Sequence, residues 1–184
     1  MRNKPFQLGI IVGRFQVFHL GHQDMIDKAA GICDTVGVFI GSSQESGTAK
    51  NPFTYEQRED ILKSIYGDSL RIYPLPDIGV GNNSSWGDYV LENVMERFGK
   101  QADIFISGKE GRRLDWLDSA NGSATAEIYI PKTIDISASE LRECLIRGDE
   151  AEWRKYSDPR LWDRFRELRG IILKSYQNKE TASI

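Results

Sequence analysis

The apolar residues of this chain fall into two kinds of segment that alternate along the sequence. Short continuous runs rich in β-branched and aromatic residues predict buried strands. Between them, apolar residues recur at three- and four-residue spacing, which is the pattern of an amphipathic helix. The predicted strands cover residues 6–12, 35–40, 70–75, 103–107 and 127–130. The predicted helices cover residues 21–32, 54–66, 85–98, 137–146 and 159–176.

This alternation predicts an α/β fold: a Rossmann-like open parallel sheet with helices on both faces, because parallel strands need crossover helices. The last predicted helix adds a short C-terminal helical extension. We therefore expect a first domain over residues 1–148 and the extension over residues 149–184. Ligands of such sheets bind beyond the carboxyl ends of the strands, where the strand order reverses. Polar segments that directly follow strands are thus the first candidates for a site.

Composition narrows the classes of function. The 184 residues suffice for one domain with a sizeable core, and the net charge of −3 gives no case for nucleic-acid binding. The sequence shows neither a cleavable signal peptide nor an apolar stretch of membrane-spanning length. Cys33 and Cys144 lie too far apart to indicate a disulfide framework. We expect a cytoplasmic protein that does not bind a membrane.

The segment after the first predicted strand, GRFQVFHLGH at residues 13–22, combines groups that suit a polyphosphate. Gly13 permits close approach to the backbone, Arg14 supplies a fixed charge, and a helix begins nearby with free N–H groups. His19 and His22 flank that helix start and could donate to phosphoryl oxygens. Two other interpretations stay open. The histidines could be metal ligands, although zinc needs three or four, or one could cap the helix while the other packs in the core.

A second polar segment, ISASELR at residues 136–142, carries the signal of a helix start. Ser137 with Glu140 three residues later forms a capping-box pattern, which by itself explains the segment structurally. In the functional interpretation, the helix start, the hydroxyls of Ser137 and Ser139, and Arg142 hold phosphates. Neither a G-x-x-x-x-G-K-[ST] loop nor a G-x-G-x-x-G fingerprint occurs.

H-x-G-H followed late in the chain by I-S-x-[ST]-x-x-R resembles the HxGH nucleotidyltransferase superfamily. The string GRFQVFHLGH is similar to the archaeal type of nicotinamide-mononucleotide adenylyltransferase, and the likeness extends over residues 6–147. Three further stretches carry it: residues 41–58, PLPDI at 74–78 followed by N-x-x-W, and FISGK at 105–109. The chain departs from the family pattern at Val17, Ser139 and Lys109, and residues 110–123 have no counterpart.

The resemblance implies site residues for two substrates and a role for each group. The implied ATP-binding residues are Gly13, Arg14, Phe15, His19, His22, Ser107, Gly108, Ser137, Ser139 and Arg142. The implied catalytic residues among them are Arg14, His19, His22 and Arg142. Lys50, Asn83 and Trp86 are the implied mononucleotide-binding residues. Outside the resemblance, Lys50 fits a solvated loop lysine and Trp86 fits a core tryptophan. No residues are implied as dedicated metal ligands; Mg²⁺ is expected with ATP.

The implied reaction is transfer of AMP from ATP to nicotinamide mononucleotide or nicotinate mononucleotide, with NAD or its acid analogue and pyrophosphate as products. One alternative is a transferase of the same superfamily with a different acceptor, such as phosphopantetheine, FMN or a polyol phosphate. Another is a non-catalytic sensor that binds ATP or NAD. We also expect a homo-oligomer, and the apolar face of the last predicted helix could pack on the core or on another subunit. Trp116, Trp153 and Trp162 lie outside the implied pyridine-binding segment.

Overall fold

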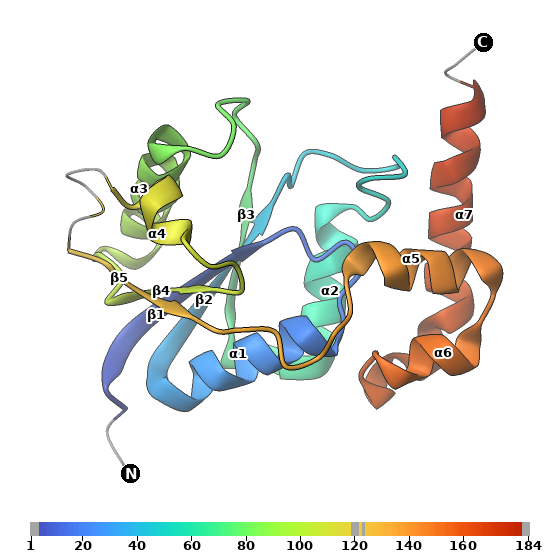
Figure 1. Cartoon of the computed structure of the whole chain (residues 1–184), viewed down its shortest axis with the longest axis horizontal. Helices are drawn as coiled ribbons and strands as arrows, with labels where there is room; N and C mark the ends of the chain where they lie inside the picture. Colours follow the sequence, from blue (N-terminus) through green and yellow to red (C-terminus); the bar gives the residue numbers. More distant parts are fainter. Residues whose placement is uncertain (1–3, 119–121, 123, 182–184) are drawn as a thin grey trace.

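The computed structural model describes residues 4–118, 122 and 124–181. Its centre is a five-stranded, wholly parallel sheet with the strand order β3-β2-β1-β4-β5 (Figure 1). The strands are β1 (Phe6–Gly13), β2 (Cys33–Gly41), β3 (Arg71–Leu75), β4 (Ile104–Ser107) and β5 (Ala126–Tyr129). All five were predicted, with ends that differ by up to two residues, so the predicted open parallel sheet is confirmed.

Seven α-helices and two 3₁₀ turns connect and extend the sheet in the described part of the chain. The helices are α1 (Leu20–Ile32), α2 (Tyr55–Tyr66), α3 (Ser84–Phe98), α4 (Arg112–Trp116), α5 (Ala138–Arg147), α6 (Glu150–Lys155) and α7 (Phe165–Thr181). The 3₁₀ turns are η1 (Gly67–Ser69) and η2 (Pro159–Arg164). The sequence did not predict α4 and α6, because helices of one or two turns are too short to show a helical period.

Local chemistry sets several helix ends. Thr54 begins α2 and Ser137 begins α5, each with a complete capping box in which Gln57 and Glu140 close the reciprocal hydrogen bond. The predicted C-terminal helix is wrong at its start, since residues 159–164 form η2 rather than α-helix. Pro159 lies at the start of that turn, where its missing N–H costs no hydrogen bond.

Helices cover both faces of the sheet, as predicted. Alternate side chains of β1 point to opposite faces. Ile11 packs in the cluster formed with α1 and α2, whereas Ile10 packs in the cluster formed with α3. In Figure 1, α3 and α4 lie on one side of the strands, and α1 and α2 lie on the other. Each face is therefore closed by its own apolar cluster, and ligands must bind at the strand ends.

The C-terminal segment packs on its own chain. Trp153 of α6 and Phe165, Leu168 and Ile172 of α7 are buried in the same apolar cluster as the α1–α2 face. Figure 1 shows α5, α6 and α7 gathered beside α2. Of the two alternatives left open by the sequence, the apolar face of α7 thus lies against the core of this chain. The division of the chain after residue 148 stays a prediction.

The helices of the described residues include none that is both long enough and apolar enough to cross a membrane.

Candidate active site

His19 caps the helix that follows β1. Its Nδ1 accepts hydrogen bonds from the backbone N–H of Gly21 at 3.1 Å and of His22 at 3.3 Å. A Cβ on Gly21 would lie 3.0 Å from that same nitrogen, which explains why glycine stands between the two histidines. Because Nδ1 accepts, neutral His19 carries its proton on Nε2. The cap therefore fixes His19 as a hydrogen-bond donor through Nε2.

His22 is held among aromatic rings. It stacks on His19 with ring centroids 3.8 Å apart, and it contacts Phe15 at 5.0 Å and Phe18 at 5.7 Å. Burial lowers the pKa of His22 well below its usual value, and the neighbouring His19 and Lys132 lower it further. Burial, with a further effect of Lys132, lowers the pKa of His19 to about 4. Both imidazoles are therefore neutral at pH 7 in this structure, and each has an N–H to donate.

Both histidines line a cavity of about 320 Å³ that we call the histidine pocket. Its walls come from the ends of β1 and β4, the start of α1, and the connection from β5 to α5. The predicted residues that line it are Gly13, His19, His22, Ser107, Gly108 and Ser137. Segments far apart in the sequence thus converge on one cavity, as the carboxyl ends of parallel strands should.

Lys132 also lines the histidine pocket, and the sequence interpretation missed it. It lies after β5, in the connection that leads to α5. The same argument that selected residues after the other strands would have selected the segment 130–136. Lys132 is exposed, and it is close enough to both histidines to lower their pKa. It therefore supplies an exposed positive charge in the wall of the pocket.

Arg142 joins α5 to the loop after β1. Its Nη1 donates to the carbonyl oxygen of Gln16, and its Nη2 donates to Ser139 Oγ at 2.9 Å. Its Nε is buried without a hydrogen-bond partner among the described residues. Arg142 and Ser139 do not line the histidine pocket; Ser139 lies in the first turn of α5, and Arg142 lies about one turn beyond the Ser137 cap. Arg142 thus ties the two predicted phosphate-binding segments together.

A second cavity, of about 400 Å³, lies beyond the ends of β1, β2 and β3, and we call it the tryptophan pocket. Its lining includes the predicted residues Arg14 and Trp86. The other polar or aromatic residues of its wall are Ser42, Asp77, Asn82 and Trp116. Trp86 is 8% exposed, so it both packs in the core and presents an edge or face to this cavity.

Asn83, which the resemblance implies as a mononucleotide-binding residue, caps α3 in the structure and does not line the tryptophan pocket. Its Oδ1 accepts from the backbone N–H of Trp86 at 3.3 Å and caps α3, and its Nδ2 donates to the carbonyl oxygen of Val80 at 2.7 Å. The neighbouring Asn82 lines the tryptophan pocket instead. The sequence could not separate the two, because which asparagine faces the cavity depends on where α3 begins.

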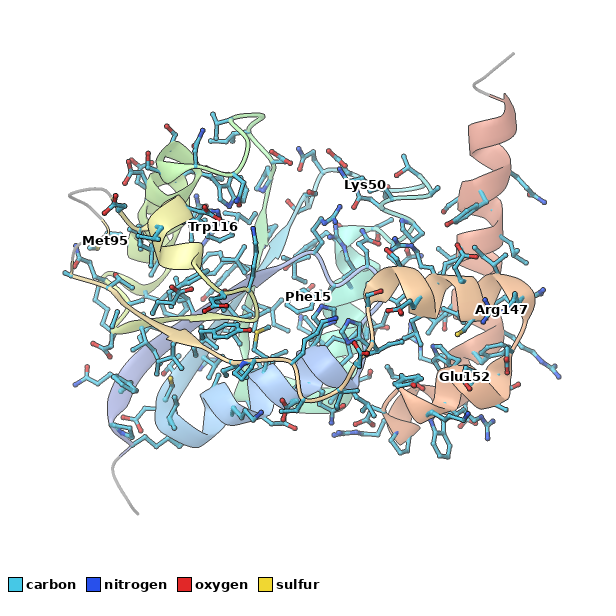
Figure 2. The ribbon with its side chains drawn as sticks, viewed as in Figure 1. Phe15, Lys50, Met95, Trp116, Arg147 and Glu152 are labelled. Carbon is cyan, nitrogen blue, oxygen red and sulfur yellow. The ribbon has the colours of Figure 1, made fainter. Side chains whose placement is uncertain are left out.

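Trp116 lies outside the implied pyridine-binding segment in the sequence, but the structure places it beside Trp86. It ends α4, lines the tryptophan pocket and meets Trp86 with ring centroids 6.2 Å apart. Its Nε1 donates to Asn82 Oδ1. Figure 2 shows Trp116 at α4, on the side of the sheet that α3 covers. No signal in the sequence pointed to it, since residues 110–123 match nothing in the family pattern.

A buried arginine holds the ends of β1 and β2 in place. Arg58 is 1% exposed, and its guanidinium donates to the carbonyl oxygens of Arg14 at 3.0 Å, Gly41 at 2.8 Å and Ser42 at 3.2 Å. Burial lowers the pKa of Arg58 to about 10, so it stays charged at neutral pH. These contacts fix the backbone that forms one wall of the tryptophan pocket.

The loop between β2 and α2 is attached to the loop after β1. Gln16 exchanges two hydrogen bonds of 2.9 Å with the backbone of Phe53, and Arg14 Nη1 donates to Asn51 Oδ1 at 3.4 Å. Lys50 is exposed on the outer part of this loop and lines neither pocket (Figure 2). Phe15, buried near the start of α5 in the same view, packs against His22 and lines neither pocket.

The two pockets meet at the end of β1. Val12 and Gly13 belong to the walls of both cavities. One pocket contains the histidines and a helix start, which suit phosphates, and the other contains two indoles, an amide and an arginine. The described residues hold no group of three or more His, Cys, Asp or Glu side chains placed to bind a metal ion. The geometry is that of two neighbouring ligand sites joined by one strand end.

This fold and this pair of pockets define a nucleotide-binding α/β protein, and the chain belongs to the cytidylyltransferase-like family, whose model matches residues 10–144. Within it, the chain belongs with the nicotinamide-nucleotide adenylyltransferases. It is 31% identical to the one from Pyrococcus furiosus over 89% of this chain and 85% of that protein. It is 43% identical to the one from Saccharolobus solfataricus, over 45% of this chain and half of that protein (50%).

A solved structure has the same fold. It is a bifunctional NMN adenylyltransferase/ADP ribose pyrophosphatase from Francisella tularensis, complexed with AMP and a Mn ion. The TM-score is 0.70 at 22% identity, over 91% of this chain and 52% of that chain. The likeness therefore concerns about half of that longer protein, and it supports the fold alone.

Proposed function

We propose that this protein transfers AMP from ATP to nicotinamide mononucleotide, giving NAD and pyrophosphate. The observation that carries the proposal is the meeting of the two pockets at Val12 and Gly13. ATP binds in the histidine pocket, and the mononucleotide binds in the tryptophan pocket. The two phosphates that react then lie next to each other at the end of β1, which supplies the proximity that the reaction needs.

The chemistry requires little from the protein beyond position and charge stabilisation. A phosphate oxygen of the mononucleotide, already ionised at neutral pH, attacks the α-phosphorus of ATP. The bond from the α-phosphorus to the bridging oxygen breaks, and pyrophosphate leaves with that oxygen and its electron pair. His19 and His22 donate through their N–H groups to the phosphoryl oxygens, where negative charge grows in the transition state. The α5 start, with Ser137, and the Lys132 ammonium bind the departing phosphates.

Arg142 and Ser139 complete the phosphate site in this proposal, with Arg142 acting from behind the loop that it holds at Gln16. Arg14, which the resemblance implies for ATP, lines the tryptophan pocket, and in this proposal it binds the phosphate of the mononucleotide. Lys50 lies on a neighbouring loop and reaches the phosphates only if that loop moves inward. Ser107 and Gly108 form the wall of the histidine pocket on the β4 side and approach the ATP nucleoside there.

The pyridine ring packs against Trp86 and Trp116. N-ribosylated nicotinamide is a cation, and an indole face attracts a cation through its quadrupole. Asn82, rather than Asn83, lines this cavity, and in this proposal its side-chain amide hydrogen-bonds the carboxamide. Mg²⁺ bound to ATP would neutralise phosphate charge here, and phosphate oxygens and water would supply most of its ligands.

The test is incubation of the purified protein with ATP and Mg²⁺ and each of several acceptors: nicotinamide mononucleotide, nicotinate mononucleotide, phosphopantetheine, FMN and a polyol phosphate. Products are identified by mass spectrometry, and pyrophosphate is measured in parallel. NAD and pyrophosphate in equal amounts are expected. A product with a different acceptor, or binding of ATP and NAD without pyrophosphate release, would replace this proposal with one of the two alternatives.

Two features stay predictions from the sequence: a homo-oligomeric assembly and a cytoplasmic location. The first is checked by light scattering of the purified protein at two concentrations.

A further inference from the structure

One carboxylate oxygen joins the two pockets. Asp115 Oδ2 accepts a hydrogen bond from Asn82 Nδ2 at 3.0 Å, and the same oxygen lies 3.6 Å from Lys109 Nζ. Lys109 lines the histidine pocket, whereas Asn82 lines the tryptophan pocket. Asn82 also accepts from Nε1 of Trp116, the residue that follows Asp115. A chain of three polar contacts thus runs from one ligand site to the other.

The residues in this chain of contacts lie where the sequence departs from the family pattern. Lys109 is one of the positions at which the sequence departs from the family pattern, and Asp115 and Trp116 lie in the stretch at residues 110–123 that has no counterpart. The connection is therefore a property of this sequence and not one that the resemblance implies. It also gives α4, a five-residue helix, a position between the two sites.

We propose that Asp115 couples the two pockets, so that ATP binding raises the affinity for the pyridine mononucleotide. This inference rests on the proposed function. The Lys109 side chain is 62% exposed, so it is held only loosely by Asp115 and is free to turn toward a stronger anion. The polyphosphate of ATP carries several negative charges close together, and it competes with a single exposed carboxylate for that ammonium group.

The loss of Lys109 from Asp115 changes the tryptophan pocket in two ways. Asp115 Oδ2 then interacts with one donor fewer. More of its negative charge is directed to the hydrogen bond from Asn82, and this bond becomes stronger. Asn82 in turn holds the Trp116 indole. In addition, the positive charge of Lys109 moves away from a site that binds a pyridinium cation. Both effects favour the bound mononucleotide.

Coupling through an exposed ion pair is modest, and we expect ATP to raise the mononucleotide affinity by up to about fivefold. The measurement is calorimetric titration of nicotinamide mononucleotide into the full chain, without and with saturating α,β-methylene-ATP. This analogue binds as ATP does but has no cleavable bond at the reacting position. Because linkage is reciprocal, the mononucleotide should raise the affinity for the analogue by the same factor.

Two variants separate the charge from the contact. In Asp115→Asn a side-chain oxygen still accepts from Asn82 but the charge is gone, so the analogue should change the mononucleotide affinity by less than about 1.5-fold. Lys109→Met removes the competing cation, so mononucleotide binding without the analogue should already be as tight as in the parent with it. Lys100→Met is the matched control. Lys100 lies before β4 rather than after it and contacts Gln7, and this variant should keep the parent's coupling.

The outcomes distinguish this inference from the proposed function. If the parent binds the mononucleotide with an affinity that the analogue does not change, the coupling is absent and the inference is overturned. Retention of the parent's coupling in Asp115→Asn or Lys109→Met would also overturn it, since both variants remove the connection. If the parent binds no pyridine mononucleotide under either condition, the proposed function fails and the inference fails with it.

Discussion

The indole rings of Trp86 and Trp116 meet at one corner of the tryptophan pocket, with ring centroids 6.2 Å apart and planes inclined at 73°. Trp86 comes from the first turn of α3, and Trp116 ends α4. With this spacing and inclination, a flat ligand cannot lie between the two rings. It can stack on one and meet the edge of the other, which is a favourable arrangement for aromatic groups.

We therefore predict different kinetic effects for the four tryptophans. Trp86→Ala should raise the KM for nicotinamide mononucleotide by about tenfold or more, because stacking and cation–π contributions are both lost, and leave the KM for ATP nearly unchanged. Trp116→Phe should raise the same KM by about threefold, since a smaller ring remains. Nucleotide-dependent fluorescence quenching should fall in both variants. Trp153→Phe and Trp162→Phe are the controls, as both rings pack in the C-terminal part of the core; quenching that is lost there instead would contradict the assignment.

The backbone of α3 also controls this corner. A Cβ on Gly87 would lie 1.7 Å from the carbonyl oxygen of Trp116, so Gly87→Ala must push α4 away from α3. Overpacking of this kind costs about 1–3 kcal/mol. We expect a lower melting temperature and a KM for the mononucleotide raised by about tenfold, with the KM for ATP changed far less. The matched control is Gly31→Ala in α1, because a Cβ there meets no atom within 4 Å. Equal loss of both substrates in Gly87→Ala would show general unfolding rather than a displaced α4.

His22 provides a test of the catalytic assignment. We predict that His22→Ala lowers kcat by about 10²–10³, because a donor to charge that develops in the transition state is lost. The KM for ATP should change by only a few-fold. His19 rather than His22 caps α1, so the helix should persist. Phe18→Leu is the control, since Phe18 packs 5.7 Å from the His22 ring but carries no donor. Turnover of His22→Ala within a few-fold of the parent would leave His22 with a packing role only.

The buried histidines should make stability depend on pH in a specific window. The pKa of His19 is lowered from 6.5 to about 4 in the folded chain, so the unfolded chain binds the proton more tightly. Its contribution to stability is complete above pH 6.5 and is lost as the pH falls from 6.5 toward 4. Between pH 7 and pH 5 the free energy of unfolding should fall by about 2 kcal/mol on this account.

Urea unfolding at pH 7 and pH 5 measures this effect in the parent and in His19→Asn, whose side-chain oxygen replaces Nδ1 as the cap of α1. The variant should lose less stability over the interval, although His22, whose pKa is also lowered, keeps part of the slope. The pKa of the Asp158 carboxyl is lowered by Arg160 to about 2, so that group titrates below this window. An identical loss in the parent and the variant would show that His19 is not held neutral by burial.

Much of the fold follows from the sequence because it depends on neighbours along the chain. The five strands were visible as apolar runs. Thr54 and Ser137 predicted the starts of α2 and α5, because each has its capping-box partner three residues later. The histidine pair, Gly13 and Ser137 all line the histidine pocket, because strand ends in a parallel sheet collect at one edge. The short α4 and the 3₁₀ turn at residues 159–164 are too short to show a helical repeat of apolar residues.

The tertiary structure alone decided which residues share a cavity. Trp116 comes to the site from a segment whose local sequence is uninformative, and the packing of α4 places it there. Lys132 follows β5, where the strand-end argument applies, but only the packing of β5 shows that it shares a cavity with the histidines. Whether Asn82 or Asn83 lines the tryptophan pocket depends on the residue at which α3 begins. With the helix starting at Ser84, Asn83 is the cap and Asn82 lines the cavity. Helix caps and strand runs are local and can be predicted from short stretches, whereas a site is a convergence of distant segments, and its members are fixed only when the whole core has packed.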